Sequence, residues 1–103
     1  MILSTTDTIE GKELKVIGFV EGSATRAKHI GNDIVASLKG IVGGEVHEYT
    51  QLLVDTREQA LGRLQEAAKS QGADAVIAMR ITTSTISAGV SEILAYGTAV
   101  KFV

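Results

Sequence analysis

The stretch Gly72-Ala73-Asp74-Ala75-Val76-Ile77 decides the fold, because a helical pattern ends at its glycine and a strand pattern begins shortly after it. Glycine often ends a helix, since it adopts the left-handed backbone conformation without steric cost. The run that opens with Ala75 is apolar, as expected of a strand within a sheet. The resulting order of a helix, a strand, a hairpin and a final strand predicts an α+β domain.

The segment before Gly72 is predicted to form a long helix from residue 45 or 46 to about residue 70. Apolar and small residues recur there at intervals of three and four, the spacing that places side chains on one face of a helix. They are Val46, Tyr49, Leu53, Thr56, Ala60, Leu64 and Ala67, with Leu52, Leu61 and Ala68 beside them. At 1.5 Å per residue the helix would be roughly 37 Å long. Its ends must therefore overhang the domain or pack on another subunit.

A shorter helix is predicted at about residues 32–40. Asn32 or Asp33 is a suitable N-cap, and Gly40 suits the position just after the last helical residue. Gly43 and Gly44 follow, and two adjacent glycines permit a sharp change of chain direction. The chain is therefore expected to contain one short and one long helix.

Three segments show strand patterns, namely residues 14–20, 75–83 and 93–103. In the last of these, small Ala95, Gly97 and Ala99 alternate with bulky side chains, so this face suits close contact with the long helix. Gly18 interrupts the first strand, and a glycine within a strand often marks a bulge. Residues 1–3 form a short apolar segment that could pair at a sheet edge.

Both faces of the predicted strands are partly apolar. The first strand places Leu14, Val16 and Val20 on one face and Lys15, Ile17, Phe19 and Glu21 on the other. The second places Ala75, Ile77, Met79 and Ile81 on one face and Val76, Ala78, Arg80 and Thr82 on the other. A two-layer fold of one sheet and its helix buries only one sheet face. The second apolar face therefore predicts that the protein forms a homo-oligomer.

Composition bounds the class of protein. The 103 residues are expected to form a single domain, residues 1–103, and a hydrophobic fraction of 45% favours a folded chain. The net charge of −2 argues against a nucleic-acid partner, which requires a basic surface. The absence of cysteine excludes disulfides and thiolate chemistry. No apolar run reaches the ~18 to 20 residues of a membrane span and no signal-peptide pattern opens the sequence, so a cytoplasmic location is expected.

A set of motifs spread over nearly the whole chain resembles the YbjQ family, small bacterial and archaeal proteins that carry a heavy-metal-binding label. The motifs are Gly18-Phe19-Val20-Glu21-Gly22, Ile41-Val42, Gly43-Gly44 with Tyr49, Arg57-Glu58-Gln59-Ala60, Glu66-Ala67-Ala68, Gly72-Ala73-Asp74-Ala75-Val76-Ile77 with Arg80, and Tyr96-Gly97-Thr98-Ala99-Val100. The resemblance implies a dodecin-like, two-layer α/β subunit with a mainly antiparallel sheet, assembled as a ring that is expected to be a pentamer. It implies no activity, because the function of the family is unsettled.

The candidate metal ligands are His29, Glu45, His47 and Glu48. Three of them cluster where the long helix is predicted to begin, but adjacent His47 and Glu48 would diverge by about 100°. Carboxylates at this position also have a structural explanation, since they complement the helix dipole. With neither cysteine nor a paired-histidine motif, a tight site for a soft metal is not expected. A divalent metal held by residues from several subunits stays open.

Gly43, Gly44 and Arg80 are the candidates for binding an anion or another ligand. The two glycines precede a helix whose free N–H groups could hold an anion, although the geometry of the helix start alone explains them. Arg80 is unusual because it lies in an otherwise apolar strand. A structural ion pair with Glu21 or Glu92 on a neighbouring strand is favoured over ligand binding.

No catalytic residue is identified. The hydroxyl-rich run from Thr82 to Ser87 is interpreted as a strand end and an exposed hairpin loop. The sequence contains no nucleophile-elbow motif, and nothing in it pairs either histidine with a nucleophile and an acid.

The expected function is therefore that of a non-enzymatic, ring-forming protein with possible binding of a small ligand between its subunits. The alternative is a metal-handling protein whose histidine and carboxylate ligands come from more than one subunit. No cofactor other than a divalent metal is implied, and the expected partner is a second copy of the chain.

Overall fold

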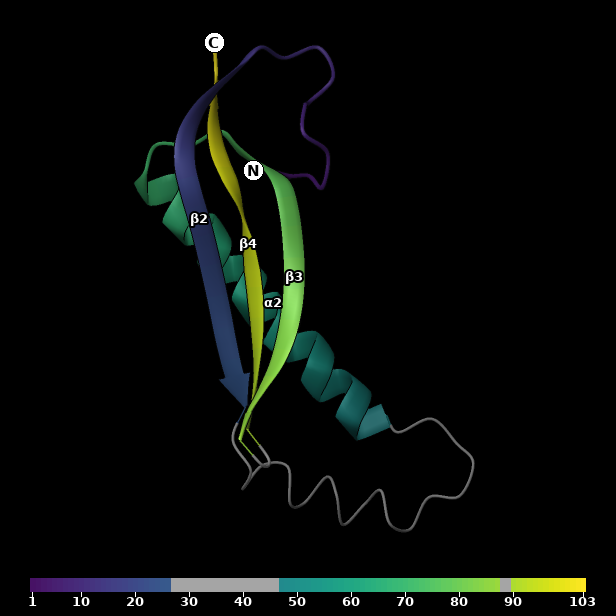
Figure 1. Ribbon diagram of the computed structural model, residues 1–103. Helices are drawn as coiled ribbons and strands as arrows, with labels where there is room; N and C mark the ends of the chain where they lie inside the picture. Colours follow the sequence, from purple (N-terminus) through teal and green to yellow (C-terminus); the bar gives the residue numbers. More distant parts are fainter. Residues whose placement is uncertain (27–46, 88–89) are drawn as a thin grey trace.

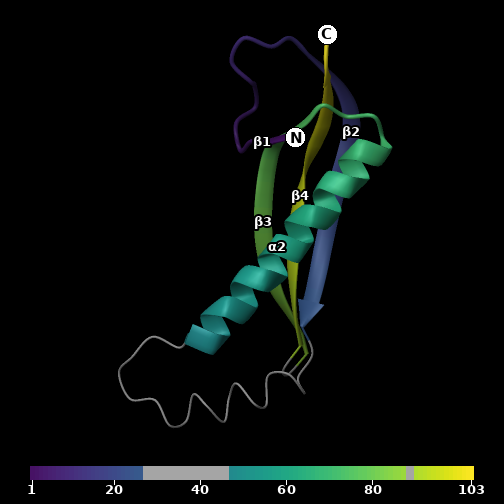
Figure 2. The same ribbon diagram turned by 180° about the vertical axis from the view of Figure 1, so that it is seen from behind.

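The computed structural model describes residues 1–26, 47–87 and 90–103. In chain order the elements are β1 (Ile2–Leu3), β2 (Leu14–Arg26), α2 (His47–Ser70), β3 (Ala75–Ser87) and β4 (Val90–Phe102). Helix α2 crosses one face of the sheet diagonally (Figures 1 and 2). The predicted two-layer α+β architecture is confirmed. The short helix predicted at residues 32–40 lies outside the described residues, as do Gly43 and Gly44.

The strands form one mixed sheet in the order β1-β3-β4-β2. Strand β4 pairs antiparallel with both β2 and β3, and β1 pairs parallel with β3 through Ile2 opposite Ala75 and Leu3 opposite Val76. The sheet is therefore mainly antiparallel, with the predicted short strand at its edge. Strands β2, β3 and β4 have 13 residues each, so the sheet is longer than the sequence pattern indicated.

The turn after α2 has the predicted glycine termination. Gly72 adopts a left-handed conformation with φ of 78°. The Gly72 N–H donates to the Lys69 carbonyl at 2.9 Å, and the Ala73 N–H donates to the Ala68 carbonyl at 3.1 Å, which is the Schellman pattern. Asp74 then joins the turn to β4, since its N–H donates to the Val100 carbonyl and its Oδ2 accepts from the Phe102 N–H.

The main core lies between α2 and the sheet. The helix contributes a row of buried residues at intervals of four, Thr56, Ala60, Leu64 and Ala68. The sheet contributes Val20, Ala24, Val76, Ile93, Ala95 and Ala99. The prediction that the small face of the last strand packs under the helix is confirmed. The predicted place of Leu53 in the helix stripe is wrong, because its side chain is 39% exposed.

The helix backbone touches the sheet at Gly22. A Cβ atom at this position would lie 2.5 Å from the Ala60 carbonyl oxygen and 2.8 Å from the Arg63 carbonyl carbon, and it would also meet the Leu64 nitrogen. Only a residue without a side chain allows this approach. The Arg63 side chain adds a hydrogen bond at the same contact, because its Nη1 donates to the Ser23 carbonyl at 2.5 Å.

Three register shifts interrupt the described sheet, one of them at its end between Thr85 and Ser87, and the two bulges in its interior change which side chains share a face. One lies in β2 between Val16 and Gly18, as the strand glycine predicted, and the other lies in β3 between Ile77 and Arg80. The first moves Val20 to the helix side, whereas Leu14 packs on the opposite side of the sheet with Val100. The predicted grouping of Leu14, Val16 and Val20 is therefore wrong.

The second bulge corrects the predicted faces of β3 in the same way. Ile77 and Arg80 lie on one face, because they oppose Thr98 and Tyr96 of β4, which alternate with the buried small residues. We call this side, turned away from α2, the outer face.

A second, smaller core covers one end of the outer face. Ala75, Ile77 and Val100 are buried there, with Ile9, Leu14 and Phe102 packed against them. The Lys12 ammonium lies 4.9 Å from the centre of the Phe102 ring, close enough for a cation–π contact. Further along the same face, the Phe19 side chain is 63% exposed.

Replacing Gly22 with Ala is predicted to lower the free energy of unfolding by about 3 kcal/mol, the upper part of the usual range for overpacking. The reason is that the new methyl group meets helix backbone, which cannot rotate away as a side chain can. Chemical denaturation at a fixed protein concentration measures the change.

The control is Gly62→Ala, which adds the same methyl group on α2, where nothing lies within 4 Å of it. This change should raise the free energy of unfolding by about 0.5–1 kcal/mol, since alanine favours a helix more than glycine does. Equal effects of the two substitutions would contradict the close contact at Gly22.

Candidate functional site

Arg80 is a predicted site residue whose side chain the structure describes. It follows the β3 bulge, and its Nη1 donates to the Thr5 carbonyl at 3.0 Å and to the Met79 carbonyl at 2.8 Å. These are main-chain partners, whereas an ion pair with Glu21 or Glu92 was expected. The guanidinium is therefore turned toward the amino-terminal segment and fixed in orientation.

Arg80 belongs to a row of side chains across the outer face. It lies opposite Tyr96 of β4, and Tyr96 lies opposite Glu21 of β2. The neighbouring row contains exposed Phe19, which lies opposite Thr98. A base, a phenol, an acid and a phenyl ring thus share one open surface. We call these four residues, Phe19, Glu21, Arg80 and Tyr96, the outer-face patch.

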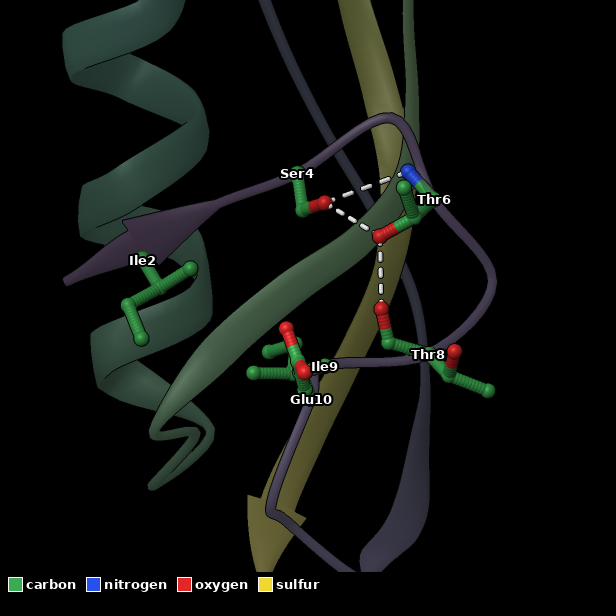
Figure 3. A pocket seen from close by; sticks show the side chains of 6 residues that line it. All are labelled: Ile2, Ser4, Thr6, Thr8, Ile9 and Glu10. Carbon is green, nitrogen blue, oxygen red and sulfur yellow. Dashed lines mark hydrogen bonds between the residues drawn. The ribbon is translucent and has the colours of Figure 1, made fainter.

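A hollow of about 470 Å³ lies beside the amino-terminal segment (Figure 3). Its walls are Ile2, Ser4, Thr6, Thr8, Ile9 and Glu10. The Ser4 and Thr6 hydroxyl oxygens lie 2.5 Å apart, and the Thr6 hydroxyl donates to the Thr8 carbonyl at 2.6 Å. These hydroxyls mainly hold the loop in shape. Sequence reasoning missed the hollow, because its residues form no motif and come from a segment without a periodic pattern.

The hydroxyl-rich run lies in strand β3 rather than in a hairpin loop. Thr82 to Thr85 and Ser87 pair with β4, and the side chains of residues 82–87 are exposed. The interpretation as a loop was therefore wrong, although the exposure was predicted. Ser87 lies opposite Val90 at the end of the ladder.

Most of the predicted metal and anion candidates lie outside the residues whose side chains the structure describes. His29, Glu45, Gly43 and Gly44 lie outside the described ranges, and His47 begins α2 with Glu48 next to it. Within residues 1–26, 47–87 and 90–103, no group of three or more histidine or acidic residues is close enough to hold a metal ion. The metal prediction therefore stays a prediction.

The helical part of the described chain does not qualify as a membrane span. None of it combines the length and the apolar character that a helix needs to cross a membrane. The cytoplasmic location stays a prediction.

The fold defines a class, a small two-layer α+β domain with one long helix on a mixed four-stranded sheet. The family model described as "Putative heavy-metal-binding" matches residues 1–103. The chain belongs to this family, YbjQ, and the resemblance found in the sequence is confirmed.

Relatives named UPF0145 protein are similar to the chain over nearly its whole length. The one from Psychromonas ingrahamii is 55% identical over 102 residues, covering 98% of this chain and 97% of its own. Those from Methanosarcina acetivorans and Vibrio parahaemolyticus are each 53% identical, covering 98% and 100% of this chain and 96% and 99% of their own. Their names state no activity.

A solved structure has a similar fold. It is the crystal structure of a protein of unknown function from Pediococcus pentosaceus, assigned to the DUF74 family. The TM-score is 0.70 with 13% identity, and the alignment covers 100% of this chain and 98% of the other. At this identity the similarity supports the fold alone.

Purified protein is predicted to retain no stoichiometric Zn²⁺ after dialysis, since the sequence has no cysteine and only two histidines. Isothermal calorimetry with Zn²⁺ measures this directly. A submicromolar site that His47→Ala or His29→Ala abolishes would contradict the prediction and identify a ligand.

Proposed function

We propose that the protein is a non-enzymatic assembly module, in which copies of the chain join head to tail into a closed, dodecin-like ring, with a pentamer as the expected size. The observation that carries the proposal is that one subunit has both an exposed apolar outer face and two different sheet edges.

Exposed apolar side chains on β2 support an interface on the outer face. Val16 is 64% exposed and Phe19 is 63% exposed, although both are apolar residues of sheet strand β2. Tyr96 adds a second aromatic ring nearby on the same face. Aromatic residues are enriched in the cores of protein interfaces. Covering this face with another subunit would remove the exposed apolar area from water.

The edges of the sheet support pairing between subunits. Strand β2 is the last strand at one side of the described sheet, and at the other side β1 pairs only with Ala75 and Val76 of β3. Residues 80–87 of β3 are exposed throughout. The two edges differ, so contact between them is heterologous, and heterologous contacts close into rings when the rotation allows.

The composition of the β3 edge supports the same proposal. Monomeric proteins protect an open edge with charged residues or proline. Residues 81–87, Ile-Thr-Thr-Ser-Thr-Ile-Ser, contain neither. Ile81 and Ile86 are apolar and exposed on this edge, at 40% and 60%. An edge of this kind is suited to accept another strand.

The dimensions of the subunit also support the proposal. Its radius of gyration is 16.9 Å, compared with about 13 Å for a compact domain of 100 residues. The principal extents of 55 × 24 × 16 Å describe a long, thin body. A thin body buries less apolar area than a compact one of equal size, so association with neighbours would add core.

A small ligand held between subunits is the second part of the proposal. The outer-face patch supplies an oriented guanidinium at Arg80 and aromatic surface at Phe19 and Tyr96. Such a surface suits an anionic group with a flat apolar part. Native mass spectrometry of protein from its source would report the subunit count and any retained ligand together.

Metal handling is the alternative function, and the heavy-metal-binding description of the family favours it. A ring could bring His47 or His29 of several subunits together with carboxylates such as Glu45. Metal retained in native mass spectra at one ion per intersubunit site would promote this alternative.

Phe19→Lys is predicted to disrupt the ring. A charged ammonium in the centre of the interface should cost about 2 kcal/mol or more per contact. Sedimentation at micromolar concentration should then show monomers, where the unaltered protein shows a closed oligomer. Circular dichroism of the variant distinguishes loss of assembly from loss of fold.

The matched control is Val103→Lys, which places the same charge at an apolar residue beyond the last strand that is 78% exposed. Assembly should persist in this variant. If the unaltered protein sediments as a monodisperse monomer, the proposal is overturned.

A further inference from the structure

We propose that residues 2–6 form a latch on strand β3 that opens independently of the rest of the sheet and controls how much of the β3 edge is accessible. The proposal assumes neither the ring nor a ligand. It rests on the hydrogen bonds of the latch, on the backbone of Ala78 and on the side chain of Arg80.

In addition to the β1–β3 ladder, four hydrogen bonds hold the latch closed. The Ser4 N–H donates to the Val76 carbonyl at 2.9 Å, and the Arg80 guanidinium donates to the Thr5 carbonyl at 3.0 Å. The Ala78 N–H donates to the Thr6 carbonyl at 2.8 Å, and the Met79 N–H donates to the Ser4 carbonyl at 2.9 Å. The latch therefore supplies acceptors for two bulge N–H groups on β3.

The bulge is strained where the latch binds it. Ala78 has φ of 51°, the left-handed region that L residues other than glycine avoid. Gly97 faces the bulge from β4, and a Cβ on Gly97 would lie 2.7 Å from Val76 Cγ1 and 2.9 Å from the Ile77 carbonyl oxygen. Strain of this kind persists only when surrounding contacts enforce it. The latch provides such contacts, so its opening would let Ala78 relax.

Little apolar burial opposes the opening. Ile2 is 45% exposed, and Thr5 and Thr6 are exposed polar residues, whereas Leu3 is partly buried against the main core. Segments held by exposed hydrogen bonds with few buried contacts open at low free-energy cost. The open latch would extend the accessible β3 edge from residues 80–87 to the whole strand, Ala75–Ser87.

Native-state hydrogen exchange, read residue by residue by NMR, tests the proposal. The amides of Ser4, Ala78 and Met79 should exchange as a group, at least about tenfold faster than amides of the β2–β4 ladder. Low concentrations of denaturant should leave their rates unchanged, which is the mark of local opening. Exchange of the two groups at one common rate would overturn the proposal.

Two substitutions of Ala78 should move the latch rates in opposite directions. Ala78→Gly removes the conformational penalty of the closed state and should slow latch exchange about threefold or more. Ala78→Val increases that penalty and should accelerate it. Rates in the β2–β4 ladder report whether either variant changes global stability. Unchanged ratios of latch to ladder rates in both variants would refute the link between strain and opening.

A matched pair of arginine variants tests the side-chain bond. Arg80→Met removes the bond to the Thr5 carbonyl and should accelerate latch exchange about threefold to tenfold relative to the ladder. Arg63→Met removes a bond of the same kind, from Arg63 to the Ser23 carbonyl on β2, and should leave that ratio unchanged. Equal responses to the two variants would show that Arg80 has no specific role in the latch.

Discussion

The contact between the α2 backbone and Gly22 of β2 is the constraint on which the rest of the domain depends. It brings the turn from Ala60 to Leu64 against the strand with no side chain between them. A helix held this closely can pack on the sheet only through small or closely fitting side chains. The buried row on α2 is of this kind, with Thr56, Ala60, Leu64 and Ala68. It also fixes α2 over β2 and β4. The second half of β3 therefore stays outside the cover of the helix, and its edge is exposed because β1 pairs only with Ala75 and Val76.

The arrangement of elements was largely predictable from the sequence, because it depends on periodicity and on a few residues with distinct conformations. The helical spacing before Gly72 predicted the long helix, and the small side chains of residues 95–99 predicted that the last strand packs under it. The bulge at Ala78 was not predictable. Alanine has no preference for the left-handed conformation, and a register shift of this kind depends on what Gly97 and the amino-terminal segment allow. A single inserted residue then reversed the predicted faces of the rest of β3.

The candidate site was predictable only in part, for a related reason. Arg80 was identified because a charged residue in an apolar strand requires a partner, but its partner was wrong. Before the bulge is known, a strand pattern places Arg80 on the face with Val76 and suggests acids on neighbouring strands. With the bulge, its guanidinium meets the Thr5 carbonyl. Backbone acceptors have no sequence signal, since every residue carries one. The hydroxyl run was misread because serine and threonine favour turns, whereas threonine is also β-branched and suits a strand.

The edge of strand β3 has a covered part and an exposed part, and the Ala78 bulge separates them. Before the bulge, the edge is covered by the amino-terminal segment through backbone hydrogen bonds. After it, the edge is exposed, and beyond Arg80 its residues 81–87 are uncharged, with hydroxyl groups and isoleucines where an open edge usually carries lysine or proline. A bulge bends the strand and increases its twist, so the two parts of the edge face different directions. A neighbouring strand could therefore pair with the exposed part without displacing the covered part. The same bulge directs Arg80 to the outer face, and so a local departure from strand geometry links the edge, the latch and the outer-face patch.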